Sequence, residues 1–166
     1  SFCHNVAWQI SMISTDGTYK KDERDFYIKW DTPFKISDDA KRITRYNESF
    51  VNKNGKEPKD VFPIIKKWLD GADYIVGHNI IGFDIYLIKE MYKMFGEDYK
   101  HLVPKLIDTN CIARGVKMEI PYKPEEDFTE YQYRIVNTRR KGVRSSLTAL
   151  GKEFNIDHDY DKLNYW

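Results

Sequence analysis

Short apolar runs alternate with stripes of helical spacing along the second half of this 166-residue chain. Residues 74–76 and 106–107 are apolar runs of the length of buried strands, and after each of them apolar residues recur every three or four positions. This repetition of strand and helix is typical of α/β proteins, in which helices pack against a sheet. The sequence therefore predicts an α/β fold.

The first 30 residues predict a β-hairpin. Apolar and polar residues alternate over residues 6–12 and again over residues 26–30, and the turn signal Asp-Gly-Thr lies between them at residues 16–18. Hairpin strands are antiparallel, whereas strands that are joined through a helix are parallel. We therefore expect a mixed β-sheet flanked by helices.

Capping residues and glycines delimit the predicted helices. Two segments lack a sustained apolar period, so we expect a loop at residues 46–57 and an inserted loop or hairpin at about residues 116–143. A chain of this length is typical of one domain, and we expect a single domain over residues 1–166. The predicted helices cover residues 38–43, 61–70, 84–95, 110–115 and 147–154.

The charge balance and the cysteine content exclude several classes of protein. There are 27 Lys and Arg residues against 26 Asp and Glu residues, a formal net charge of +1, which excludes a histone-like polycation. Cys3 and Cys111 are too few for a disulfide scaffold or a zinc cluster, so we expect reduced thiols in a cytoplasmic protein. No apolar run reaches the length of about 18 residues that a membrane span needs, and we expect no membrane association.

The segment from Val76 to Asp84 joins a predicted strand to the helix that follows it. Helical spacing places Asp84 on the same face as the apolar residues of that helix, where a carboxylate is costly unless donors or cations meet it. Two interpretations stay open from the residues alone. Asp84 is a capping residue held by backbone amides, or it is a metal ligand at the carboxyl end of the strands, where open α/β sheets place their sites.

The segment VGHNIIGFD, residues 76–84, resembles the second motif of the DEDD family of 3′→5′ exonucleases. Further segments resemble this family in the same order along the chain. The resemblance implies a ribonuclease-H-like mixed sheet flanked by helices and a site for two divalent cations, Mg²⁺ or Mn²⁺. The other segments that carry the resemblance are VAWQISMIS, ISDDAKRIT, VFPIIKKWLDGADYIVGHN, LIDTNCIARG and SSLTALGKEFNI.

The resemblance implies roles for individual residues of this segment. Asp84 corresponds to the catalytic carboxylate that ligates metal, and Phe83 to an aromatic residue beside the site. His78 and Asn79 correspond to residues that bind near the nucleotide, although His78 also suits a hydrogen-bonded position that fixes the strand-to-helix turn. Asp108 either reaches the same cleft or caps the helix after it, and we expect the cap.

The DEDD family needs four carboxylates and a His or Tyr general base. The resemblance places the first motif, an Asp-x-Glu pair, just before Ser1, and the third motif beyond Trp166. His158 is the nearest candidate for the third motif, but the residue five positions on is Leu163 and not an aspartate. We therefore expect the chain to be truncated at both ends and inactive by itself.

Residues 134–144 carry five basic residues and no acidic ones. Arg139, Arg140 and Arg144 are candidates for contacts with the backbone phosphates of a nucleic acid. A solvated loop balanced by the acidic residues at 125–130 is the alternative. Three tyrosines nearby either stack on bases or pack within the fold, namely Tyr122, Tyr131 and Tyr133.

The resemblance as a whole implies an enzyme that removes nucleotides from the 3′ end of single-stranded DNA or RNA. Proofreading during DNA replication, DNA repair and RNA turnover are the expected roles, with a polymerase subunit as a further candidate partner. The alternative is a non-catalytic ribonuclease-H-like module that binds nucleic acid or a polymerase. The expected location is the cytoplasm of a bacterial or phage-infected cell.

Overall fold

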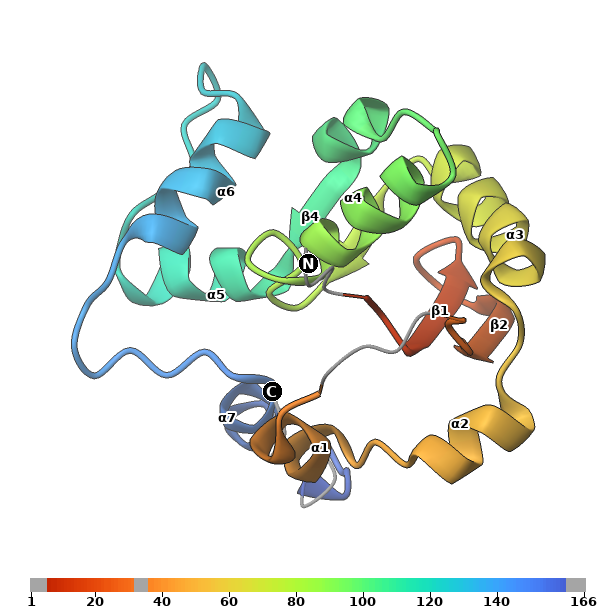
Figure 1. Cartoon of the computed structure of the whole chain (residues 1–166). Helices are drawn as coiled ribbons and strands as arrows, with labels where there is room; N and C mark the ends of the chain where they lie inside the picture. Colours follow the sequence, from red (N-terminus) through yellow and green to blue (C-terminus); the bar gives the residue numbers. More distant parts are fainter. Residues whose placement is uncertain (1–5, 32–35, 161–166) are drawn as a thin grey trace. The chain divides into compact units, whose positions relative to one another are not determined.

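The computed structural model describes residues 6–31 and 36–160 (Figure 1). The chain divides into two compact units, Ser1–Gly71 and Ala72–Trp166. Strands and helices both occur in each unit, so the predicted α/β class is confirmed. The expectation of a single domain stays a prediction, and Cys3 and Leu163 lie outside the described residues.

The first unit begins with the predicted hairpin. Strand β1 (Gln9–Thr15) pairs antiparallel with β2 (Lys20–Tyr27). The side chain of Asp16 accepts hydrogen bonds from the two N–H groups of Thr18 and Tyr19. Gly17 adopts a φ of +91°, which glycine does at little cost. Local chemistry therefore closes this turn, and the hairpin prediction is confirmed.

Three helices follow the hairpin in the first unit, and the N-cap of the first of them is Ser37, as predicted. The prediction of a loop at residues 46–57 is wrong, because the side chain of Asn47 accepts a hydrogen bond from the N–H of Phe50 and caps a helix there. That helix buries only Val51, so its apolar period is too short to recognise. The three helices are α1 (Asp38–Thr44), α2 (Glu48–Asn54) and α3 (Pro58–Gly71).

The second unit is built on a parallel pair of strands. Strand β3 (Ile75–Gly77) pairs with β4 (Leu106–Asp108), so that Gly77 lies opposite Asp108 at the carboxyl ends of both. A parallel pair requires a crossover connection. Here the crossover consists of helix α4 (Asp84–Met94) and the 3₁₀ helix η1 (Lys100–Lys105). Both predicted short strands and the helix between them are confirmed.

Three further helices complete the second unit: α5 (Thr109–Lys117), α6 (Phe128–Asn137) and α7 (Leu147–Glu153). The expected loop or hairpin at about 116–143 is wrong for the ten residues that form α6. Asp127 caps α6 through the N–H of Glu130. The buried face of α6 packs on α5 around a small core made of Cys111, Met118, Tyr131 and Ile135.

The described residues form two two-stranded sheets, one antiparallel and one parallel. Both strand orientations that the predicted mixed sheet requires are therefore present. The free thiol of Cys111 is buried. Within the part of the chain that the structure describes, no helix has the length and apolar character needed to cross a membrane.

Candidate functional site

Asp84 is the first residue of α4 and lies half-buried just beyond the carboxyl end of β3. The N-cap position belongs to Phe83, whose side chain cannot accept a hydrogen bond, so Asp84 is not the capping residue. Burial raises the pKa of the Asp84 carboxyl group, a hydrogen bond with its own backbone N–H opposes this rise, and the negative charge of Asp108 adds to it. None of the described residues forms an ion pair with Asp84. An added cation would therefore stabilise its charged form.

Asp108 is completely buried, with 0% of its surface exposed, and its carboxylate is saturated with backbone donors. Its Oδ1 accepts hydrogen bonds from the N–H groups of Asn79 and Asn110 at 2.9 Å each, and a longer one from Cys111 at 3.3 Å. Its Oδ2 accepts one from Ile81 at 3.1 Å. The predicted cap of α5 by Asp108 is confirmed. The same carboxylate also fixes the loop between β3 and α4.

Gln132, from the buried face of α6, holds the strand that carries Asp108. Its Oε1 accepts a hydrogen bond from the backbone N–H of Asp108 at 2.7 Å, and its Nε2 donates one to the carbonyl of Leu106 at 2.9 Å. Gln132 is itself 0% exposed. Three elements therefore set the position of the Asp108 carboxylate: β4, α5 and α6.

The support that Asp108 and Gln132 give to this loop is not among the predictions from the sequence. A signal for Asp108 was available, because the carboxyl ends of two neighbouring parallel strands meet at one edge. An aspartate directly after the second apolar run, at 106–107, must then lie near the loop that follows the first, at 74–76. Gln132 gives no such signal, because its segment shows no recognisable period.

The loop between β3 and α4 has a fixed and partly strained shape. Asn79 adopts a φ of +64°, a conformation that asparagine tolerates better than most residues. Its carbonyl accepts a hydrogen bond from the N–H of Gly82 at 3.1 Å. A Cβ at Gly82 would lie 2.5 Å from Oδ1 of Asn79, so a larger residue here would displace the side chain of Asn79. The aromatic ring of Phe83 follows, 46% exposed.

His78 connects this loop to two other segments of the second unit. Its Nδ1 lies 3.0 Å from Oγ1 of Thr109, which is also 3.3 Å from the carbonyl oxygen of Gly77. Burial lowers the pKa of His78, and this effect is opposed by the charge of Asp108 and by a hydrogen bond with the backbone of Ser145. His78 therefore has the hydrogen-bonded position in the strand-to-helix turn, next to the segment that leads into α7.

The candidate arginines have different surroundings. Nη1 of Arg140 donates a hydrogen bond to the carbonyl of Met118 at 2.7 Å, which ties the segment after α6 to the end of α5. Arg139 and Arg144 are exposed. Arg144 lines a pocket of about 430 Å³, and the next residue is Ser145, the backbone partner of His78. Of the three, only Arg144 is thus connected to the loop that carries Asp84.

Most of the remaining charged and aromatic residues in this region have structural partners. Arg134 forms an ion pair with Glu126 at 2.7 Å, so the acidic cluster does balance part of the basic one. The hydroxyl of Tyr131 donates a hydrogen bond to the carbonyl of Ile120 at 2.7 Å, and Tyr122 packs edge-on against it. Tyr133 is half-buried. Tyr131 is therefore packed within the fold, whereas Tyr122 is 44% exposed beside it.

Of the two aspartates described at the carboxyl ends of β3 and β4, only Asp84 suits a divalent cation as a ligand. Its carboxylate is the hard oxygen ligand that Mg²⁺ and Mn²⁺ prefer. Asp108 lies close by, but both of its oxygens already accept backbone hydrogen bonds. Among residues 6–31 and 36–160, no three His, Cys, Asp or Glu side chains gather into a metal site. Asp84 therefore fits as one ligand of a divalent ion.

Comparison with known families identifies a match that covers most of the chain. The model of the RNase T family, described as exonuclease, matches residues 5–160, a range that spans both compact units. No curated protein sequence matches the chain. Because the match covers nearly the entire chain, this protein belongs to the RNase T family of DEDD-type exonucleases, whose fold is ribonuclease-H-like and whose general activity is that of a nuclease.

Proposed function

We propose that this protein is a metal-dependent 3′→5′ exonuclease that removes nucleotides from the 3′ end of single-stranded DNA or RNA. The supporting observation is the state of Asp84. Its carboxylate is half-buried at the carboxyl end of a parallel strand, its pKa is raised by burial, and no described residue forms an ion pair with it. Membership of the exonuclease family supplies the class of reaction.

Asp84 is the residue proposed to hold divalent cations in this enzyme. Such cations, when bound, offset the charge of the scissile phosphate and make water a better nucleophile at neutral pH. The chain's own contribution is to keep the Asp84 carboxylate in place. Asp108 does this indirectly, because it holds Asn79 and Ile81 through their backbone N–H groups and so fixes the loop that ends at Asp84.

The neighbours of Asp84 are proposed to bind the terminal nucleotide. Phe83 directly precedes Asp84, is 46% exposed, and is proposed to stack on a base. His78 and Asn79 lie at the other end of the same loop, where their fixed backbone limits how a nucleotide can approach. Arg139 and Arg144 are proposed to contact phosphates, whereas Arg140 is already bound to the carbonyl of Met118.

The proposal includes a cellular setting. Proofreading, DNA repair and RNA turnover all require a frayed 3′ end and the same chemistry, so each is a compatible role, and a polymerase subunit is the proposed protein partner. The cytoplasm is the proposed compartment. The free thiol of Cys111 is consistent with reducing conditions there.

The test is hydrolysis of a 5′-labelled single strand by the full-length protein in the presence of Mg²⁺. A 3′→5′ exonuclease produces a ladder that shortens from the unlabelled end. We expect Asp84→Asn to lower the rate by about a hundredfold or more, because a neutral amide is a poor ligand for Mg²⁺. Asp73→Asn is the matched control, since Asp73 is an exposed aspartate that precedes β3. Equal rates for Asp84→Asn and wild type would contradict the proposal.

A second measurement separates metal binding from activity. We expect Mn²⁺ to raise the melting temperature of the wild type more than that of Asp84→Asn, because a ligand that binds only the folded state stabilises it. If neither Mg²⁺ nor Mn²⁺ supports hydrolysis while the protein still binds a single strand, the proposal fails. The non-catalytic module is then the correct function.

A further inference from the structure

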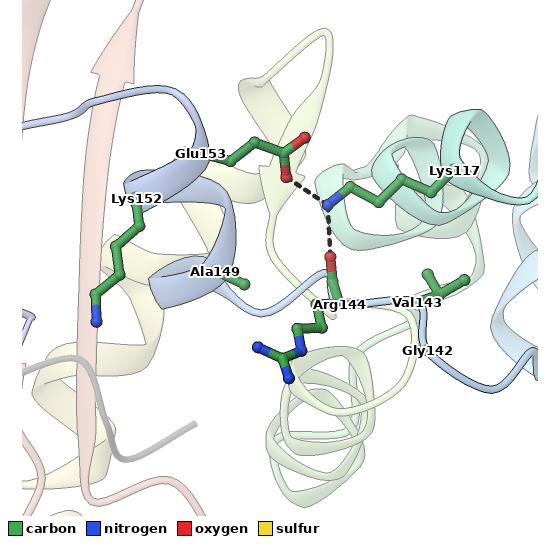
Figure 2. A pocket seen from close by; sticks show the side chains of 7 residues that line it. All are labelled: Lys117, Gly142, Val143, Arg144, Ala149, Lys152 and Glu153. Atoms are coloured by element: carbon green, nitrogen blue, oxygen red, sulfur yellow. Dashed lines mark hydrogen bonds and ion pairs between the residues drawn. The ribbon is translucent and has the colours of Figure 1, made fainter.

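The second unit contains a pocket of about 430 Å³ whose lining is basic (Figure 2). It is formed by the last residue of α5, by the segment before α7 and by α7 itself. Three cationic side chains line it, against one carboxylate. The lining residues are Lys117, Gly142, Val143, Arg144, Ala149, Lys152 and Glu153.

The charges in this pocket do not cancel. Nζ of Lys117 forms an ion pair with Glu153 and donates a hydrogen bond to the carbonyl of Arg144 at 2.7 Å. These two side chains therefore neutralise each other, as the dashed lines in Figure 2 indicate. Nζ of Lys152 lies 5.7 Å from the ring centroid of Tyr160, a contact that leaves its charge in place. The guanidinium of Arg144 is exposed and pairs with no described carboxylate.

One hydrogen bond links the segment that lines this pocket to the loop that carries Asp84. Arg144 is followed by Ser145, whose backbone is hydrogen-bonded to His78. His78 begins the loop that ends at Asp84, and that loop is fixed by Asp108. Arg144 is therefore one residue away from a direct contact with the loop that carries Asp84.

We propose that this pocket binds a backbone phosphate of the substrate strand, upstream of the terminal nucleotide, with Arg144 as the principal contact. The inference rests on the proposed function and adds a substrate requirement, namely a strand long enough to reach the pocket. The planar guanidinium of Arg144 forms two parallel hydrogen bonds to phosphate oxygens, a geometry that lysine lacks. Lys152 adds long-range attraction, and Glu153 weakens binding by repulsion.

The experiment measures the binding of a fluorescent 12-nucleotide single strand by anisotropy, in EDTA, over a range of salt concentrations. Hydrolysis does not interfere without divalent ions. We expect Arg144→Ala to weaken binding about tenfold and to lower the slope of log affinity against log salt by about one. Glu153→Gln should tighten binding, because it removes the one carboxylate among the described residues that line the pocket and leaves the charge of Lys117 uncompensated. Lys123→Ala is the control, an exposed lysine outside the pocket whose loss should change neither quantity.

Two further measurements vary the length of the substrate and add free phosphate as a competitor. A dinucleotide is too short to reach the pocket, so Arg144→Ala should leave its hydrolysis unchanged while raising KM for the 12-nucleotide strand. Inorganic phosphate at millimolar concentration should compete weakly with the strand for the wild type. If it binds as tightly as the strand does, the pocket is a site for free phosphate and the proposal is overturned.

The outcomes distinguish this proposal from the proposed function. If the protein hydrolyses the strand but Arg144→Ala and Glu153→Gln keep the wild-type salt slope and affinity, the pocket assignment is overturned and the exonuclease stands. If the binding changes occur as expected but hydrolysis is absent, the pocket stands as a strand-binding site of a non-catalytic module. An equal loss for Lys123→Ala and Arg144→Ala also overturns the pocket assignment.

Discussion

Two aspartates at the carboxyl ends of β3 and β4 have opposite surroundings. Asp108 accepts hydrogen bonds from four backbone N–H groups, which compensate fully for its burial. Asp84 is less buried, no described cationic side chain pairs with it, and burial raises the pKa of its carboxyl group. The same residue type is therefore structural at position 108 and available for chemistry at position 84. The difference lies in the number of donors that the backbone provides.

Asp108→Asn tests the structural role. The substitution replaces one acceptor oxygen by an NH₂ group that faces backbone donors, so at least one buried N–H loses its partner. We expect the free energy of unfolding to fall by about 2–4 kcal/mol, measured by urea denaturation. Asp73→Asn, at an exposed position, should change it by less than about 0.5 kcal/mol. Equal losses for the two variants would show that the buried hydrogen bonds do not contribute to stability.

Cys111 gives the molecule a defined sensitivity to alkaline pH. Burial, reinforced by the charge of Asp108, raises the pKa of its thiol from 9.0 to about 12. The folded state therefore retains a proton that the unfolded state releases above pH 9, and stability must fall as the pH rises from 9 towards 12. We expect this fall to be steeper for the wild type than for Cys111→Ala. Thermal denaturation of both proteins between pH 8 and pH 11 measures the difference.

Helix α6 acts on the candidate site without contributing a residue to it. Its Gln132 side chain bonds to the backbone of β4 at two points, Leu106 and Asp108. The sulfur of Cys111 in α5 in turn lies 3.4 Å from the carbonyl oxygen of Gln132. The position of the Asp108 carboxylate therefore depends on a helix that is distant from it in sequence.

Gln132→Met tests this dependence. Methionine fills a similar volume, so the main effect is that the N–H of Asp108 and the carbonyl of Leu106 lose their partners. We expect a loss of about 2–3 kcal/mol in the free energy of unfolding, measured by urea denaturation. Asn137→Ala, on the exposed end of the same helix, serves as the control. A loss no larger than that of the control would mean that water replaces Gln132 at no cost.

The elements that were predicted correctly are specified by residues that lie close together in the chain. The hairpin depends on Asp16 and Gly17, which are adjacent, and the cap of α1 depends on Ser37, directly before it. The two missed helices lack such a signal. Helix α2 buries one residue, and in α6 the buried polar side chain of Gln132 interrupts the apolar stripe. Periodicity identifies a helix only when its buried face is both long and apolar.

Only one segment of the candidate site could be predicted from the sequence. The motif at residues 76–84 indicated Asp84, but the register that brings Gly77 opposite Asp108 joins segments about thirty residues apart. No local pattern specifies that register. For the same reason the sequence indicated three arginines equally, and their different surroundings became apparent only from contacts with Met118 and Lys117.

The molecule as a whole is nearly neutral, with a formal net charge of +1. Its capacity to bind a polyanion therefore depends on local charge and not on the overall field. In the second unit Arg144 and Lys152 line one pocket and pair with no described carboxylate, and Asp84 pairs with no described cationic side chain. This separation suits the proposed exonuclease, with cationic side chains for the strand and an acidic side chain as the proposed metal ligand.

The side-chain amide of Gln132 has a further consequence for how this protein associates with others. By occupying the outward N–H of Asp108 and the outward carbonyl of Leu106, it takes the place that a neighbouring strand would fill. Sheet growth in that direction is blocked, whether by another part of the same chain or by a foreign peptide. Any strand added to this pair must therefore lie along β3.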